Sequence, residues 1–192
     1  MKKALIGYGG HAREVMAQMG IKLTCFVDDK YIKHEDPTVP LSLFNPENYV
    51  VMIAIADPKV RFEILQKLPK ETQFFTFIHP TALLMNNIEI GEGSFIGAYS
   101  ILTTNIKLGK HTILNRGNHI GHDCIVGDYF SAMPGSIVSG NVTISNSVYM
   151  GNNSSIKEKI SICNNVTIGS NATVVKDIVT SGVYVGVPAK LI

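Results

Sequence analysis

The strongest constraint on the fold is an apolar residue at every sixth position through the second half of the chain, without interruption from Ile90 to Val174. The residue after this position is often glycine, and the residue two before it is mostly small or aliphatic. Neither an α-helix nor a simple alternating strand has a period of six. The pattern predicts a β-solenoid in which each hexad supplies one short strand and a turn. The aliphatic side chains stack inside, and the glycines are expected to make the tight corners.

The first 78 residues follow a different pattern, in which short apolar runs alternate with helices. Strands are expected in KKALIGYG, KLTCFVDD, YVVMIAIA and TQFFTFI, and helices in HAREVMAQMG and DPKVRFEILQKL. Gly20 should end the first helix, with Asp57 as N-cap and Pro58 as first residue of the second. Strands alternating with helices indicate a parallel sheet. We therefore expect an α/β lobe over residues 1–78, half-Rossmann-like in size, followed by a parallel β-helix over residues 79–192.

Composition argues against two classes of partner. With 45% hydrophobic residues, 17% charged residues and a formal net charge of +2, the chain has no concentrated basic patch for nucleic acid. Its apolar runs are too short to span a bilayer, and no signal segment opens the sequence. Three widely separated cysteines, Cys25, Cys124 and Cys163, are more typical of reduced thiols than of a disulfide framework. These features lead us to expect a cytoplasmic protein without membrane insertion.

Both halves carry motifs that resemble one group of bacterial enzymes. The motifs are GYGGHA, FVDD, IHPTA, NRGNHIGHDC, GDYFSAMPGS, SGNVTI and the tail VVKDIV…VYVGVPAKLI. Together with the hexads, they resemble the sugar O- and N-acetyltransferases of the sialic acid and bacillosamine type, in the left-handed β-helix hexapeptide-repeat superfamily. The resemblance implies that three hexads close one triangular coil and that acetyl-CoA is the co-substrate. It also implies a homotrimer with its active cleft between subunits, and a role in surface polysaccharide or glycan synthesis.

The glycine-rich loop GYGGHA, residues 7–12, fits a turn between a strand and a helix. Glycines there permit close approach of a phosphate to the amides at the helix N-terminus. With Asp28 about 20 residues later, the loop is also compatible with NAD, or with no ligand at all. The resemblance implies instead a nucleotide-linked sugar. The residues that it places near the diphosphate, base and ribose are Gly9, Gly10, His11, Asp28, Asp29 and Lys30.

The densest group of titratable residues lies in NRGNHIGHDCIVGDY, residues 115–129. Because Ile120 points inward in the hexad frame, His119, His122 and Asp123 are expected on the outside of the coil, and Cys124 inside. A carboxylate next to an imidazole can hold one tautomer and stabilise the imidazolium, which would suit a general base. Ordinary polarity at an exposed turn is the alternative.

The resemblance assigns roles around this pair. His122 matches a general base, Asp123 its acidic partner, and Gly140 the backbone N–H that stabilises the oxyanion of the tetrahedral intermediate. Asn115 matches a residue that positions the acceptor. Ser131 stands where many relatives carry a histidine that contacts the acetyl donor, which leaves the donor contact at this position open.

Acetyl-CoA is expected to lie in the groove between neighbouring solenoids. Gly140, Gly151 and Gly169 lack side chains and would admit the thin pantetheine arm. Lys190, in the tail, would meet the CoA phosphates, with a solvated terminal lysine as the alternative.

The histidines could alternatively bind a zinc ion. Some hexapeptide-repeat proteins are zinc carbonic anhydrases, and His111, His119 and His122 are the candidate ligands. No paired Cys/His spacing and no acidic neighbour of His111 support a metal centre, so none is predicted. His79 is expected to be a residue of the junction between the halves, and His34 to lie in a polar loop.

The sequence with this resemblance predicts acetyl transfer from acetyl-CoA to a nucleotide-linked amino sugar, such as a 4-amino-4,6-dideoxy sugar. No cysteine stands where an acetyl-enzyme would form, so transfer is expected to be direct. O-acetylation of a sugar hydroxyl, such as that of sialic acid, is the alternative within the enzyme class. A non-catalytic structural β-solenoid is the alternative outside it.

Overall fold

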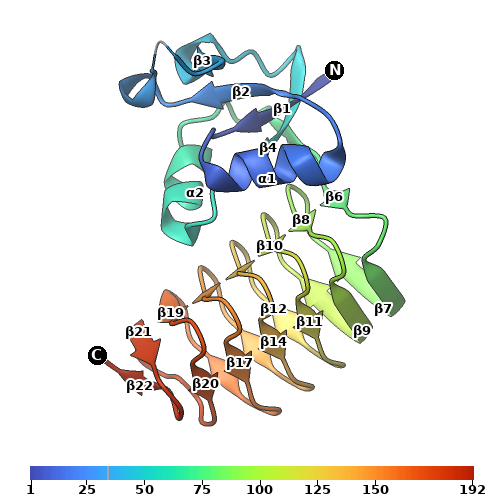
Figure 1. The fold of residues 1–192 in the computed structure, drawn as a ribbon, viewed down its shortest axis with the longest axis vertical. Coiled ribbons are helices and arrows are strands. Elements are labelled where there is room, and N and C mark those ends of the chain that lie inside the picture. The colour runs from blue at the N-terminus through green and yellow to red at the C-terminus, as the bar shows by residue number, and fades with distance from the viewer. Residues whose placement is uncertain (34) are drawn as a thin grey trace.

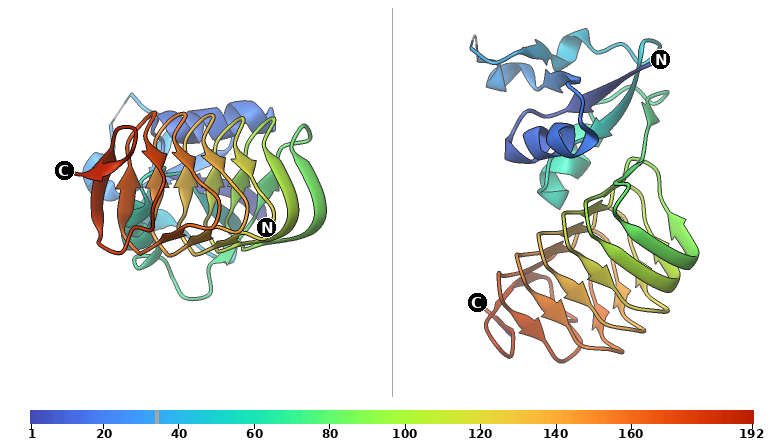
Figure 2. Two further views of the ribbon diagram at one scale, coloured as in Figure 1. Left: turned by 90° about the horizontal axis from the view of Figure 1, so that it is seen from below. Right: turned by 45° about the vertical axis from the view of Figure 1, so that its right-hand side comes forward.

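An α/β lobe rests on one side of a coiled β-domain in the computed structural model of the chain (Figure 1). The structure describes residues 1–33 and 35–192, so the loop position expected for His34 lies outside the described residues. Two further views show the coils of the β-domain stacked along one axis, with the lobe beside them (Figure 2). Among the described residues, no helix is both long and apolar enough to cross a membrane.

Five parallel strands form the sheet of the lobe, in the order β3-β2-β1-β4-β5. Helix α1 packs on one face of this sheet and α2 on the other, because their buried residues belong to two separate hydrophobic clusters. In chain order the elements are β1 (Lys2–Ile6), α1 (Gly10–Met19), β2 (Thr24–Val27), η1 (Asp29–Tyr31), β3 (Thr38–Pro40), η2 (Leu41–Leu43), β4 (Tyr49–Ile53), α2 (Pro58–Leu65) and β5 (Gln73–Phe74).

The two predicted helices are confirmed, as are the residue that ends α1 and the residue that caps the start of α2, whereas α2 ends at Leu65, before the end of the predicted segment. Gly20 follows α1 with φ of 68°, the left-handed conformation that terminates a helix. At the start of α2 the Asp57 side chain accepts hydrogen bonds from the N–H groups of Lys59 and Val60. Strand β3 was not predicted, because three residues containing a proline carry no strand pattern.

The segment TQFFTFI, predicted as one strand of the lobe, is divided between the two domains. Strand β5 pairs with β4, whereas β6 pairs in parallel with β8 of the solenoid. Phe75 is buried in a cluster that the lobe shares with Phe95 of the solenoid, and the Phe77 ring stacks on Phe95. The change of sheet therefore falls between Phe74 and Phe77, shortly before the predicted boundary at residue 78.

The β-domain consists mainly of short strands that recur every six residues; β7 and β9 are longer, and β21 and β22 form an antiparallel pair at the C-terminal end. The strands are β6 (Phe77–Ile78), β7 (Leu83–Ile90), β8 (Phe95–Ile96), β9 (Ile101–Leu108), β10 (Ile113–Leu114), β11 (His119–Ile120), β12 (Ile125–Val126), β13 (Ser131–Ala132), β14 (Ile137–Val138), β15 (Thr143–Ile144), β16 (Tyr149–Met150), β17 (Ser155–Ile156), β18 (Ser161–Ile162), β19 (Val166–Ile168), β20 (Thr173–Val174), β21 (Gly182–Val185) and β22 (Lys190–Leu191).

Three hexads close one coil, as the resemblance implied. Strands one coil apart pair in parallel at a spacing of 18 residues, as in the pairing of His119 with Ile137 and of Ile125 with Thr143. The residues at every sixth position form one continuous core, in which Ile96, Leu102 and Ile156 are fully buried. The coil therefore has three faces, carried by β10, β11 and β12 and by the strands stacked on each.

The corners of the coils are made by residues in the left-handed backbone region, one at every sixth position from Asn87 to Asn171. Asparagine and aspartate tolerate this conformation better than other residues with a side chain. The glycines that follow the apolar positions, such as Gly121, are therefore not the corner residues, and the prediction that they make the corners is wrong. A Cβ added to Gly121 would lie 2.7 Å from the Gly140 nitrogen in the next coil, so this glycine permits close stacking rather than the corner itself.

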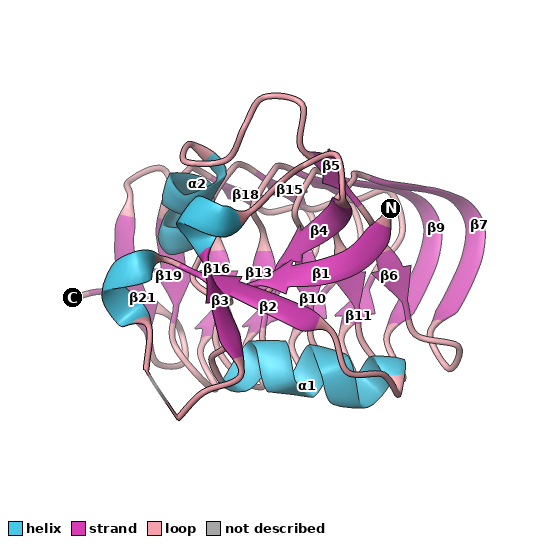
Figure 3. Ribbon diagram, turned by 90° about the horizontal axis from the view of Figure 1, so that it is seen from above, coloured by secondary structure: helices cyan, strands magenta, loops and turns pink. Residues whose placement is uncertain are grey.

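Hydrogen bonds from Arg61 of α2 join the lobe to the solenoid. Its guanidinium is fully buried, and Nε donates to the His111 carbonyl oxygen at 3.0 Å while Nη2 donates to the Tyr129 carbonyl oxygen at 2.9 Å. Burial lowers the pKa of Arg61 to about 9, so the group stays protonated at neutral pH. Seen from above, the lobe covers the face formed by β10, β13 and β16 (Figure 3).

Candidate active site

A histidine–aspartate pair lies at the corner between β11 and β12. The Nδ1 atom of His122 lies 2.7 Å from the Asp123 Oδ2 atom, and the two side chains are 56% and 45% exposed. Asp123 occupies the corner position, with φ of 58°, and this conformation turns its side chain back towards the neighbouring imidazole. His119 is exposed and Cys124 is buried. The predicted orientations of these four side chains are therefore confirmed.

The charge state of Asp123 decides which nitrogen of His122 carries a proton. The hydrogen bond with His122, and then that from the Asn105 amide, lower the pKa of Asp123 below its usual value. At neutral pH the group is thus a carboxylate, which only accepts hydrogen bonds. In the neutral form of His122, Nδ1 therefore holds the proton, and Nε2 has a free lone pair that can accept a proton from a substrate.

Gly140 lies directly against the His122 ring, one coil further along. A Cβ at position 140 would lie 2.5 Å from the Nε2 atom of His122, so any larger residue displaces the imidazole. No backbone acceptor within residues 1–33 and 35–192 receives a hydrogen bond from the Gly140 N–H. A residue with an unbonded N–H, packed against an imidazole ring, offers both a donor and a base for acyl transfer.

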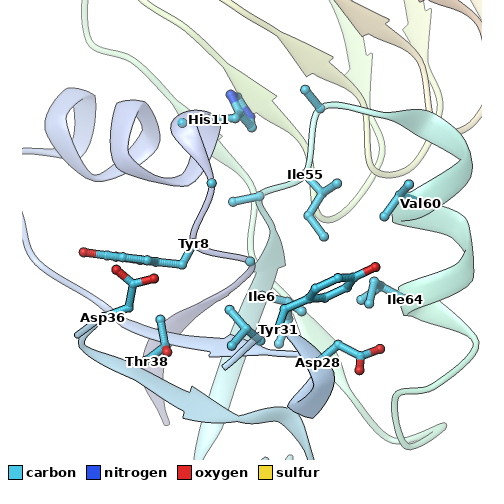
Figure 4. A pocket seen from close by; sticks show the side chains of 16 residues that line it. Ile6, Tyr8, His11, Asp28, Tyr31, Asp36, Thr38, Ile55, Val60 and Ile64 are labelled. Carbon is cyan, nitrogen blue, oxygen red and sulfur yellow. The ribbon is translucent and has the colours of Figure 1, made fainter. Parts of the chain in front are cut away.

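A cavity of about 440 Å³ opens beside the glycine loop of the lobe (Figure 4). Gly9 and Gly10 stand at its edge, where Gly9 is the N-cap of α1 and the first amides of the helix lie at the cavity. Positive partial charge at a helix N-terminus favours a diphosphate there. Tyr31, with 67% of its surface exposed, also lines the cavity and was missed by sequence reasoning.

Of the three residues predicted near the base and ribose, only Asp28 lines this cavity. It forms an ion pair with Lys67. The Asp29 carboxylate accepts from the Ser42 N–H at 3.1 Å, and the Lys30 ammonium lies 4.8 Å from the centre of the Tyr31 ring. Asp29 and Lys30 thus make contacts within the loop, and their expected place near the base and ribose stays a prediction.

His11 lies between this cavity and the solenoid. Its side chain is 8% exposed and meets the edge of Phe95, with 5.5 Å between ring centres. Burial, and then the positive charge of Arg61, lower the pKa of His11 to about 4, so the imidazole is neutral near pH 7. Neither ring nitrogen has a hydrogen-bond partner among the described residues. The expected phosphate contact would therefore be a neutral hydrogen bond, not an ion pair.

A second cavity, of about 600 Å³, adjoins the first and shares Gly10 and His11 with it. Asn115 and Glu14 lie on its wall, and the Asn115 amide donates to the Glu14 carboxylate at 3.2 Å. Burial acts to raise the pKa of Glu14, but hydrogen bonds from Asn115 and Arg116 outweigh it and lower the pKa. Glu14 was missed because a single acidic residue on a helix has no pattern of its own.

Ser131 is not available to an acetyl donor. The side chain is fully buried, and its hydroxyl donates to the Ala56 carbonyl oxygen at 2.7 Å and accepts from Arg61 at 2.9 Å. The donor contact that was left open at this position is therefore not offered by the buried Ser131 hydroxyl. The residue belongs to the junction between lobe and solenoid, and no motif in the sequence marks Arg61 as its partner.

The glycines expected to admit pantetheine have different surroundings. Gly140 faces His122, but a Cβ at Gly151 would lie 2.6 Å from the Ser170 nitrogen, and one at Gly169 would lie 2.8 Å from the Val185 side chain. Gly151 and Gly169 thus permit close stacking within the solenoid, and the absence of their side chains is explained without a bound pantetheine arm. Lys190 is exposed at the wall of a cavity of about 310 Å³ at the C-terminal end.

The His122–Asp123 pair, called the dyad below, lies away from the lobe of its own chain. The lobe covers the face of β10, whereas His122 stands at the corner that joins the other two faces (Figures 1 and 3). A sugar held in the cavities beside Gly10 and Asn115 is thus on one side of the coil and the imidazole on another. One chain presents both halves of a site but does not bring them together.

The histidines do not form a metal centre in the part of the chain that the structure describes, where no three His, Cys, Asp or Glu side chains could hold an ion. His111 is buried, with its ring stacked on Tyr129 and its edge against Phe74. Burial lowers the pKa of His111 to about 4.

Known proteins resemble the chain in both sequence and fold. Residues 2–68 match the family described as PglD N-terminal domain. A GDP-perosamine N-acetyltransferase of Escherichia coli O157:H7 is 27% identical over 135 residues, 70% of this chain and 54% of the relative. The match therefore spans about half the length of that curated relative.

Solved structures extend the likeness to the whole chain. WeeI from Acinetobacter baumannii AYE is 27% identical, with a TM-score of 0.89 over 100% of both chains. A mutant of perosamine N-acetyltransferase from Caulobacter crescentus, in complex with CoA and GDP-perosamine, is 24% identical, with a TM-score of 0.87 over 99% of this chain and 96% of that one. The predicted fold class, an α/β lobe followed by a left-handed parallel β-helix, is confirmed, as is the resemblance to hexapeptide-repeat sugar acetyltransferases.

Proposed function

We propose that the chain is an acetyl-CoA-dependent N-acetyltransferase that acts on a nucleotide-linked amino sugar. The observation that carries the proposal is the His122–Asp123 pair, whose free Nε2 atom lies against Gly140. The likeness to a GDP-perosamine N-acetyltransferase supports an amine as acceptor and makes GDP-perosamine the first candidate substrate. A cytoplasmic location fits enzymes that use acetyl-CoA.

The proposed reaction uses two groups at this corner, the Nε2 atom of His122 and the Gly140 N–H. The sugar amine attacks the thioester carbonyl, and His122 Nε2 takes the proton that the amine loses. Asp123 stabilises the imidazolium that forms, while the Gly140 N–H donates to the oxyanion of the tetrahedral intermediate. Collapse of the intermediate breaks the C–S bond, and the imidazolium returns the proton to the departing thiolate of CoA.

Transfer is direct in this proposal. Cys124 follows the dyad in the sequence, but its thiol is buried and burial raises its pKa. A buried protonated thiol is a poor nucleophile. Amine and thioester must therefore be bound together.

The two cavities of the lobe suit a nucleotide sugar. The nucleoside occupies the cavity beside Asp28 and Tyr31, and the diphosphate lies at Gly9 and Gly10. The sugar then extends past His11 into the second cavity, where Glu14 and Asn115 present a carboxylate and an amide. A carboxylate that stays ionised attracts a sugar ammonium before it is deprotonated for attack.

A homotrimer completes the site. Because the lobe and the dyad lie on different sides of one coil, a sugar bound to one copy meets the dyad of a neighbouring copy. Three copies around a three-fold axis give three such sites. Acetyl-CoA lies along the groove between copies, with its phosphates near Lys176 and Lys190, which both line the C-terminal cavity.

The test is thiol release from acetyl-CoA against GDP-perosamine and against UDP- and dTDP-linked 4-amino sugars. We expect turnover with one amino sugar, and a loss of at least about 10²-fold for His122→Ala. His119→Ala is the matched control, because His119 is an exposed histidine on the adjacent strand and should keep full activity. Full activity of His122→Ala would contradict the assignment of the base.

The same assay decides between the alternatives. Reaction with a sugar hydroxyl but with no amine would make the chain an O-acetyltransferase. If no acceptor reacts and acetyl-CoA does not raise the melting temperature, the solenoid is structural, since only a ligand that binds the folded state stabilises it.

A further inference from the structure

The corner that carries the dyad also carries a row of two amide side chains and one carboxylate, one from each of three successive coils. Asn87, Asn105 and Asp123 stand 18 residues apart, and each has a backbone in the left-handed region with φ between 53° and 58°. The Asn87 amide donates to the Asn105 side-chain oxygen at 2.9 Å, and the Asn105 amide donates to Asp123 Oδ1, also at 2.9 Å. The row ends at His122, which binds the other carboxylate oxygen.

The chemistry of the last member sets the direction of the whole row. A carboxylate has no hydrogen to donate, so Asn105 must turn its NH₂ group towards Asp123. The Asn105 oxygen then faces Asn87, which can only satisfy it as a donor. Each amide is thus held in one of its two orientations by the next, and the orientation at Asn105 follows from the ionised state of Asp123.

This row leaves the two oxygens of Asp123 with separate tasks. Oδ1 is held by Asn105 and Oδ2 faces Nδ1 of His122. A carboxylate bound at one oxygen only could rotate about its Cβ–Cγ bond and offer either oxygen to the imidazole. With Oδ1 held, the imidazole ring has one partner in one place, and its Nε2 atom stays against Gly140.

We infer that Asn105, supported by Asn87, is a positioning residue for the His122–Asp123 pair. Asn105 forms no hydrogen bond with His122. It acts by holding the Asp123 carboxylate, not by binding the substrate. The hydrogen bond from Asn105 also contributes to the lowered pKa of Asp123, after that with His122. The kinetic role rests on the proposed acetyltransferase function, whereas the effect on the imidazole does not.

Glycine is the informative substitution at this corner. Asn105→Gly removes the amide but suits the left-handed backbone, so it should not unfold the coil. Asn105→Asp keeps the size of the side chain but places a carboxylate against the carboxylate of Asp123, which replaces attraction by repulsion. Asn165→Gly is the matched control, because Asn165 has φ of 59° on a different corner.

The experiment combines steady-state kinetics of the full chain with ¹⁵N NMR of its histidines, assigned by comparison with His122→Ala. For both Asn105 variants we expect kcat to fall about tenfold, with KM for either substrate and the melting temperature unchanged. The His122 signals should show loss of the single tautomer that is protonated at Nδ1. Asn165→Gly should behave as wild type in both measurements.

The two readouts separate the possible failures. If the unmodified chain acetylates no acceptor, the proposed function fails, while the NMR signals of His122 still report on Asn105. If Asn105→Gly and Asn105→Asp keep kcat within twofold and leave the His122 tautomer unchanged, the inference is overturned. A fall in kcat that accompanies an equal fall in melting temperature for Asn105→Gly and Asn165→Gly alike would also overturn it, because the role would be structural.

Discussion

Gly140→Ala should lower the proposed acetyltransferase activity without unfolding the chain. The added Cβ would lie 2.5 Å from Nε2, 2.6 Å from Cε1 and 2.9 Å from Cδ2 of the His122 imidazole. Ordinary contacts begin near 3.4 Å, so the ring must move by about 0.9 Å. A misplacement of about 1 Å at a reacting group costs roughly 10²-fold in rate. Because alanine keeps the backbone N–H, the variant isolates the position of the base from loss of the oxyanion donor.

The assay is thiol release from acetyl-CoA at saturating amino sugar, together with urea unfolding of the same protein. We expect kcat to fall about 10²-fold, with little change in the free energy of unfolding, because the half-exposed imidazole can rotate away. Gly91→Ala is the contrasting control. Its Cβ would lie 2.5 Å from the Lys110 backbone nitrogen, so it should cost about 1–3 kcal/mol of stability and leave kcat unchanged.

Two results would refute the reasoning. If Gly140→Ala keeps kcat within threefold of wild type, the imidazole is not the base or its place against Gly140 does not matter. If the variant loses stability as Gly91→Ala does, the loss of activity has a structural origin.

Three further predictions concern the junction, the buried histidines and the tail. Arg61→Met should lower the free energy of unfolding by about 3 kcal/mol, because five backbone carbonyl oxygens at the junction lose a donor, and wild-type urea stability would contradict this. The pKa values of His11 and His111 are lowered from 6.5 to about 4 in the folded state, so the unfolded chain takes up protons first as pH falls. Urea unfolding at pH 7, 6 and 5 should therefore show stability falling below pH 6.5, by up to about 1.4 kcal/mol per histidine per pH unit, whereas a flat profile would refute it. Lys190→Ala should raise KM for acetyl-CoA about fivefold at constant kcat, and an unchanged KM would remove Lys190 from the site.

Several features of the fold and the site are local enough to be predicted from the sequence. The period of six sets which side chains face the core, because one hexad is one strand and one turn. The same frame places His122 and Asp123 side by side outside the coil, and neighbours in sequence need no tertiary contact to meet. The end of α1 at Gly20 and the start of α2 at Asp57 follow from the local sequence for the same reason.

Other features depend on contacts between residues far apart in the chain. Ser131 is buried because Arg61, 70 residues earlier, binds its hydroxyl. TQFFTFI is divided between two sheets because its first part pairs with β4 of the lobe and its last part pairs with β8 of the solenoid. Asn105 meets Asp123 only because one coil contains 18 residues, and this spacing becomes a contact when coils stack.

The sequence alone determined the solenoid, the glycine loop at the head of α1 and the dyad at a corner, since each depends on a short repeat or on adjacent residues. The tertiary structure decided which of these come together. The lobe lies on the face opposite the corner of His122 and Asp123, so the cavities of the lobe and the proposed base of one chain are apart. That placement is the result of side-chain packing between domains, chiefly at Arg61 and Phe95, and no local pattern encodes it.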